Sequence, residues 1–96
     1  PKLKLYENGS RRKLRLTKRQ WSHIRKKHPE VENFEDIEQT LKNPLKIINY
    51  SLDETIAYYY KYFKHRIFSD KYLLVLVKYL NGEGYIITAY FEEYIR

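Results

Sequence analysis

Residues 17–30, with the sequence TKRQWSHIRKKHPE, gather the side chains best suited to proton transfer and to binding a polyanion. They hold two of the three histidines, the only tryptophan and five Lys or Arg residues. Histidine titrates close to neutral pH and is the usual proton-transfer group. The surrounding cations are what RNA would bind. Proton transfer beside a phosphate-binding surface is the minimum equipment of a ribonuclease that needs no metal ion.

His28 is the better placed of the two histidines for acid–base catalysis. On a helix it shares one stripe with Trp21 and Ile24 and so faces the rest of the domain. His23 lies about 140° further around, on the basic flank. A structural helix cap is the alternative for His28. For His23 the alternative is a phosphate contact or no role at all.

Positive charge is concentrated at the start of the chain. Residues 1–30 carry eleven Lys or Arg against two acidic residues, whereas residues 31–96 carry eight against ten, within a total of +7. Such asymmetry favours a nucleic-acid-binding face, although a merely solvated basic face is the plainer alternative. The candidate nucleic-acid contacts are Arg19, Arg25, Lys26, Lys27, Arg66 in the loop KHRIFSD, and Tyr60 from a tyrosine row that could stack bases or simply pack.

Two helices are predicted in the first half of the chain. Thr17 is a typical N-cap for a helix from Lys18 to about Lys27, and Pro29 ends it because proline disfavours helical backbone at the preceding residue. A second helix from about Phe34 to Lys42 follows Asn33, a candidate cap. These helices occupy residues 17–43 of a single domain that spans residues 1–96.

The hydrophobic period changes to two over residues 45–96, which predicts a sheet. Asn81-Gly82-Glu83-Gly84 is a strong hairpin turn. The expected fold is α+β: two N-terminal helices packed on a four-stranded antiparallel meander. A basic hairpin in residues 1–15, turning at Asn8-Gly9-Ser10, would add to it. The predicted meander strands are Lys46–Tyr50, Thr55–Phe63, Tyr72–Leu80 and Tyr85–Phe91.

Three strand residues could assist a histidine. Lys78 interrupts an apolar strand and could bind a phosphate, or its stem could simply cover apolar surface. Thr88 and Tyr90 share one face of the last strand, and their hydroxyls could orient a phosphate or a 2′-hydroxyl. Whether Lys78 lies on that same face depends on the hairpin register, which the pattern leaves open.

Composition excludes several classes of site. The absence of cysteine excludes disulfides and thiolate metal sites and permits a cytoplasmic location. No apolar run approaches the roughly 20 residues that span a membrane. No spacing of His, Asp or Glu indicates a metal, and no motif indicates a cofactor. We therefore expect no metal and no cofactor. Oligomeric state stays open, with a homodimer through a tyrosine-rich edge strand as one option.

Five motifs in order resemble a known group of nucleases. They are Trp21-Ser-His-Ile, His28-Pro-Glu, Thr40-Leu-Lys-Asn-Pro44, Tyr72-Leu-Leu-Val-Leu-Val-Lys78 and Ile87-Thr-Ala-Tyr90. Across about residues 16–91 they resemble the phage-type branch of the barnase/EndoU/colicin/RelE-like (BECR) ribonuclease fold, many of whose members are toxin domains. The resemblance implies a metal-independent ribonuclease of the α+β class. The toxin role and a protein inhibitor (antitoxin) as partner are also implied by it alone.

The sequence therefore predicts an endoribonuclease that cleaves RNA by attack of the 2′-hydroxyl. His28 or His23 would be the acid–base group, Lys78 would stabilise charge, and Thr88 with Tyr90 would position the substrate. A non-catalytic RNA- or DNA-binding module that uses the same basic face is the alternative. A domain that binds an acidic protein partner is a third hypothesis.

Overall fold

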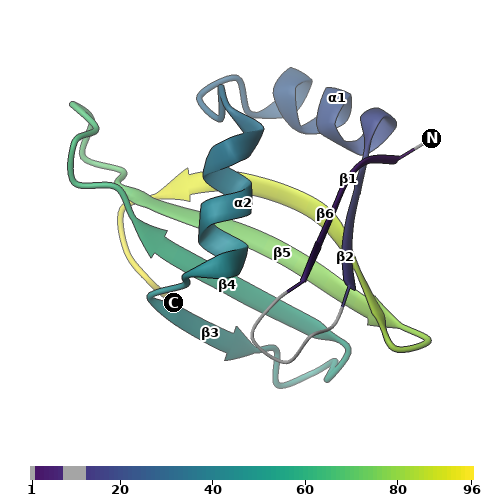
Figure 1. Cartoon of the computed structure of the whole chain (residues 1–96). Helices are drawn as coiled ribbons and strands as arrows, with labels where there is room; N and C mark the ends of the chain where they lie inside the picture. The colour runs from purple at the N-terminus through teal and green to yellow at the C-terminus, as the bar shows by residue number, and fades with distance from the viewer. Residues whose placement is uncertain (1, 8–12) are drawn as a thin grey trace.

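Six strands form one mixed sheet, on which the two helices pack (Figure 1). The computed structural model describes the backbone of residues 2–7 and the whole of residues 13–96. The strand order is β1-β2-β6-β5-β4-β3. The predicted turn at residues 8–10 lies outside the described residues. The strands are β1 (Lys2–Glu7), β2 (Lys13–Thr17), β3 (Lys46–Asn49), β4 (Ile56–Tyr62), β5 (Tyr72–Leu80) and β6 (Glu83–Glu92).

The α+β class is confirmed, but the prediction of a sheet of four antiparallel strands is wrong for the sheet as a whole. Strands β3 to β6 do run antiparallel in sequence order, and the hairpin β1–β2 extends them. The hairpin joins β6 through parallel pairing of β2, at Leu14 with Gly84 and Arg15 with Tyr85. This pairing buries the apolar side of β2 and closes the start of the β6 edge, where unpaired backbone groups would otherwise remain.

Local signals place both helices, α1 (Lys18–Lys27) and α2 (Phe34–Lys42), where the sequence predicts them. The Thr17 hydroxyl accepts a hydrogen bond from the backbone N–H of Gln20 at 3.0 Å, which caps α1. At the other end His28 leaves the helical region, with φ −133° and ψ 73°, as expected before a proline. Asn33 precedes α2 without a side-chain capping bond. No helix in the described residues is long and apolar enough to cross a membrane.

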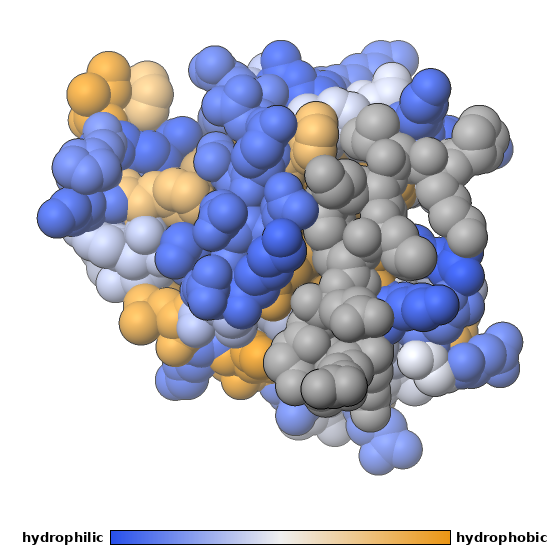
Figure 2. Space-filling model, viewed as in Figure 1, coloured by the Kyte–Doolittle hydropathy of each residue, from blue (hydrophilic) through white to orange (hydrophobic). Residues whose placement is uncertain are grey.

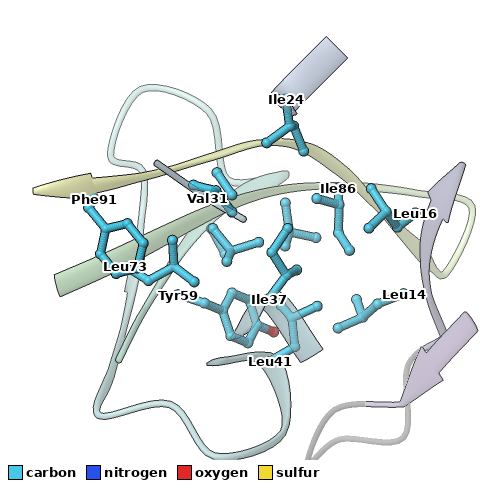
Figure 3. Close-up of a cluster of buried hydrophobic side chains, with 14 residues drawn as sticks. Leu14, Leu16, Ile24, Val31, Ile37, Leu41, Tyr59, Leu73, Ile86 and Phe91 are labelled. Atoms are coloured by element: carbon cyan, nitrogen blue, oxygen red, sulfur yellow. The ribbon is translucent and has the colours of Figure 1, made fainter. Parts of the chain in front are cut away.

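The main core lies between the helices and one face of the sheet (Figure 3). Helix α2 crosses this face over β4 and β5, whereas α1 lies beside β6 (Figure 1). Ile24 is the buried residue of α1, and α2 buries Ile37, Thr40 and Leu41. The sheet contributes the alternate residues of its strands, among them Leu14, Leu16, Tyr59, Leu73, Val75, Val77, Ile86 and Phe91.

An irregularity in β6 decides which side chains share the opposite face of the sheet. Leu76 pairs with Thr88 whereas Val77 pairs with Ile86, so Ile87 is an extra residue and the alternation shifts by one there. Ile86 and Ala89 both face the core as a result. The opposite, helix-free face therefore carries Lys78, Thr88 and Tyr90 together, which resolves the register left open by the sequence.

The chain after β6 returns across the helix-free face. The Arg96 side chain there contacts both Tyr58 of β4 and Tyr90 of β6. Leu74 of β5 lies between Tyr60 and Tyr90 on this face. Leu74 and Tyr60 are fully buried, although they lie on the face without helices. A small second core thus forms beneath Arg96, and β5 is buried on both faces from Leu73 to Val75.

Candidate active site at the edge of β6

His28 and Tyr90, two of the predicted site residues, meet at the edge of β6. Their ring centroids are 5.0 Å apart with an interplanar angle of 33°. Helix α1 can lie along this edge because β2 pairs only with the beginning of β6, and the Gln20 side-chain amide donates a hydrogen bond to the Ile87 carbonyl. His28 is one-third exposed, and its Nδ1 lies 3.8 Å from Glu30 Oε2. Its imidazole is therefore fixed against Tyr90 yet open to solvent.

Arg96 brings a cation to the same place. Its Nη2 donates to the Tyr90 hydroxyl at 2.8 Å and lies 3.5 Å from Glu92 Oε2. The buried Tyr60 hydroxyl donates to the other Glu92 oxygen at 3.1 Å, and burial raises the pKa of that hydroxyl. Sequence reasoning missed Arg96 and Glu92, because no local pattern indicates that the chain turns back after its last strand. The position of Arg96 after an aromatic strand is the only available signal.

Lys78 shares the face of Thr88 and Tyr90 but is held away from His28. Thr88 is opposite Leu76, so Lys78 lies about 7 Å further along β5, and the row of Tyr90 is about 13 Å from Lys78. The Lys78 ammonium pairs with Asp53 Oδ2 at 3.1 Å.

Asp53 is itself fixed in the turn between β3 and β4. Its Oδ1 accepts hydrogen bonds from the backbone N–H of Thr55 at 3.0 Å and from the Thr55 hydroxyl at 2.5 Å. These bonds, with the nearby Lys78 charge, lower the pKa of Asp53 to about 2. Asp53 therefore stays ionised at neutral pH, and its negative charge balances the positive charge of Lys78. The sequence pattern did not predict this ion pair.

The exposed face of α1 carries four of the predicted polar residues. Arg19, His23, Lys26 and Lys27 are exposed to solvent there. Figure 2 shows that the outer surfaces of α1 and α2 are hydrophilic. The basic surface, defined here as Arg19, Lys26 and Lys27, ends one residue before His28 along the chain. Its last member, Lys27, is therefore the chain neighbour of the candidate proton-transfer residue.

Three of the residues predicted to contact nucleic acid, Arg25, Tyr60 and Arg66, make contacts within the fold. Arg25 donates to the carbonyl oxygens of Pro29 at 2.6 Å and Val31 at 2.9 Å, which fixes the turn after α1. Tyr60 is fully buried and presents no ring to a base. Arg66 is the third. Its guanidinium lies 3.6 Å from the Phe91 ring centroid and its Nε donates to the Asp70 carbonyl. The pattern could not show these contacts, because each depends on a partner brought close by folding.

Comparisons with known proteins identify no family. No protein-family model, no curated protein and no solved structure matches this chain.

The arrangement itself joins three kinds of chemistry at one edge. The His28 imidazole can accept or donate a proton. The Tyr90 hydroxyl can donate a hydrogen bond, and the Arg96 guanidinium can bind phosphate oxygens through two parallel N–H groups. Within residues 13–96, no three His, Asp or Glu side chains form a group that could hold a metal ion. The side chains at this edge suit proton transfer beside a bound phosphodiester.

Proposed function

We propose that this domain is a metal-independent endoribonuclease, with its active site at the edge of β6. The contact of the His28 ring with Tyr90, whose hydroxyl accepts a hydrogen bond from Arg96, is the observation that carries the proposal. The basic surface next to this edge would attract the phosphate backbone of RNA. The BECR resemblance of the sequence motifs supports the same function, and a toxin role with a protein inhibitor rests on that resemblance alone.

In this mechanism His28 takes the proton from the ribose 2′-hydroxyl. The 2′-oxygen then forms a bond to phosphorus, the bond from phosphorus to the 5′-oxygen breaks, and the leaving oxygen takes a proton from the solvent or from the imidazolium. The products are a 2′,3′-cyclic phosphate and a free 5′-hydroxyl. Arg96 stabilises the charge that develops on the phosphate, and Tyr90 holds the imidazole and the guanidinium in place. Thr88 and Lys78 contact the flanking backbone from the same face of the sheet.

The test compares His28→Ala with His23→Ala, because both histidines lie on one helix and only His28 contacts Tyr90. Cleavage of a single-stranded RNA is measured with EDTA present, and the 3′ ends are examined for cyclic phosphate. The His28 variant should lose at least about 100-fold in rate, the usual contribution of a general acid–base group. The His23 variant should stay near the wild-type rate, and RNA binding should persist in both.

An RNA with a single 2′-deoxy residue at the cleaved position provides the matched substrate control. It should bind but resist cleavage, because it lacks the attacking hydroxyl. If the wild-type protein cleaves no RNA with or without magnesium, the enzyme proposal is wrong. Equal loss in the two histidine variants would also contradict the assignment of His28.

A non-catalytic RNA-binding module is the second candidate, favoured by one specific observation. Three basic side chains on this side of the sheet lie near an acidic side chain of the same chain: Lys78 is 3.1 Å from Asp53, Arg96 is 3.5 Å from Glu92, and His28 is 3.8 Å from Glu30. Such pairing reduces the charge available to stabilise a transition state. Salt-dependent RNA binding without cleavage would support this second function.

A further inference from the structure

A pocket of about 340 Å³ lies on the helix-free face, next to the candidate active site. It is formed where the end of β3 and the turn after it meet β4 and the returning C-terminal segment. The volume is within the range of sites for small organic molecules, about 300–1,000 Å³. Its walls are Ile48, Asn49, Tyr50, Ser51, Tyr58 and Arg96.

The pocket lining combines aromatic rings with groups that can form hydrogen bonds. The rings of Tyr50 and Tyr58 lie 6.0 Å apart at 57°. Ile48 pairs directly with Tyr58 on the neighbouring strand, so the two side chains lie side by side on this face. Asn49 and Ser51 also line the pocket, and each brings donor and acceptor atoms of its backbone or side chain to it. A planar heteroaromatic ring with polar edges fits these walls, since such a ring can stack on tyrosine while its edge is hydrogen-bonded.

Arg96 connects this pocket to the candidate active site. Its guanidinium carbon lies 5.3 Å from the Tyr58 ring centroid, and its Nη2 donates to the Tyr90 hydroxyl at 2.8 Å. Tyr90 in turn contacts His28. A ring in the pocket, a phosphate at Arg96 and a ribose 2′-hydroxyl towards His28 follow the order of groups across one phosphodiester. They would be the base of the nucleotide on the 3′ side, the phosphate, and the 2′-hydroxyl of the nucleotide on the 5′ side.

From these contacts we propose that the pocket is a nucleobase subsite, which selects the unpaired base next to the cleaved phosphate. The inference rests on the proposed ribonuclease function and makes single-stranded RNA the substrate. A base inside a duplex is covered by its neighbours and cannot enter a pocket, so paired RNA is excluded.

Tyr50→Leu is the variant that tests the subsite, because it keeps apolar bulk but removes the ring. Tyr50→Phe should bind as wild type does. The matched control is Tyr62→Leu, since Tyr62 pairs with Tyr72 at 5.1 Å in a similar ring contact at the other end of β4. The probes are the four ribonucleoside 5′-monophosphates and ribose 5-phosphate, titrated by calorimetry against the whole chain carrying His28→Ala.

At least one nucleotide should bind ten-fold or more tightly than ribose 5-phosphate. Tyr50→Leu should lose that ten-fold advantage, whereas Tyr62→Leu should retain it. Equal affinity for nucleotides and ribose 5-phosphate would overturn the subsite, and so would equal losses in the Tyr50 and Tyr62 variants. Thermal unfolding of each variant shows whether it is folded. If Tyr50→Leu does not fold, the comparison of nucleotides with ribose 5-phosphate on the folded protein still decides whether the pocket binds a base.

The binding test separates this inference from the proposed enzyme activity. Base-dependent binding without RNA cleavage by the wild type would retain the pocket and reject the nuclease. Cleavage by the wild type, with the same base preference after Tyr50→Leu, would retain the nuclease and reject the pocket.

Discussion

Asp53 shows how one side chain can determine the role of another. Its Oδ1 is occupied by two hydrogen bonds from Thr55, which leaves Oδ2 to face the Lys78 ammonium. Lys78 therefore reaches towards the β3–β4 turn and away from Tyr90. An RNA phosphate that binds Lys78 must compete with this carboxylate, so Asp53 sets how strongly Lys78 can contribute to binding.

Asp53→Asn should lower the stability of the fold in a pH-dependent way. The pKa of Asp53 falls from 3.8 to about 2 in the native state. The native state therefore binds this proton less readily than the unfolded state does, and the carboxylate stabilises the fold above pH 4. That contribution is lost as the pH falls through about 2. Asparagine keeps an oxygen for Thr55 but loses the charge that faces Lys78.

Urea unfolding at several pH values checks this expectation. The midpoint of Asp53→Asn should lie below that of the wild type at pH 7, and the two should converge as the pH approaches the native pKa of about 2. Glu54→Gln, a change at the exposed neighbouring acid, is the control. A difference between Asp53→Asn and wild type that stays constant over the whole pH range would contradict the assignment.

At the scale of elements, the sequence predicts well those helices and turns that a short stretch of chain determines by itself. Thr17 and Pro29 define α1 by capping and by restricting the backbone. The turn at Asn81 and Gly82, with φ of 57° and 79°, needs residues that tolerate positive φ. The parallel pairing of β2 with β6 could not be predicted in this way. It joins segments far apart in sequence, and either edge of the meander would satisfy the apolar pattern of β2.

The parallel pairing of β2 with β6 requires a residue without a Cβ atom at Gly84. A Cβ at Gly84 would lie 2.5 Å from Leu14 Cδ2 and 2.9 Å from Val77 Cγ1. Gly84→Ala should therefore destabilise the fold by about 1–3 kcal/mol, the usual cost of overpacking. Guanidinium or urea unfolding measures the loss.

Gly82→Ala is the matched control for Gly84→Ala. Gly82 has φ 79° with no atom near the added Cβ, so its cost is backbone strain of about 1–2 kcal/mol. Amide exchange separates the two effects. Faster exchange in β2 is expected for the Gly84 variant alone, and equal exchange of β2 in both variants would mean that Gly84 does not hold the hairpin.

At the scale of the whole molecule, the sequence singled out two residues of the candidate site, His28 and Tyr90, and missed the third, Arg96. His28 was singled out from its residue type and its helical stripe, and Tyr90 gained weight from the BECR resemblance. Arg96 went unnoticed because its role requires the chain to return across the sheet. Arg25 and Arg66 were expected at the surface, but both are engaged by carbonyl groups or rings that only the folded chain brings near.

The basic surface on α1 should control the salt dependence of RNA binding. Removing Lys26 and Lys27 together should reduce the slope of log Kd against log salt concentration by roughly 1.4, at about 0.7 per phosphate contact in single strands. Fluorescence anisotropy with a labelled RNA measures the slope. Lys42→Ala, which removes an exposed cation paired with Glu38 on α2, should leave it unchanged. An unchanged slope in the double variant would place the RNA elsewhere.

The pairing of β2 with β6 also has a consequence for how the chain folds during synthesis. Arg15 bonds Glu83 across 68 residues, and His28 meets its partner Tyr90 on that same late strand. Contacts between distant residues slow folding, because a long loop must close before they form. The helices emerge from the ribosome well before β6 does. A nascent chain therefore carries His28 without Tyr90, and the candidate site forms only after β6 has docked.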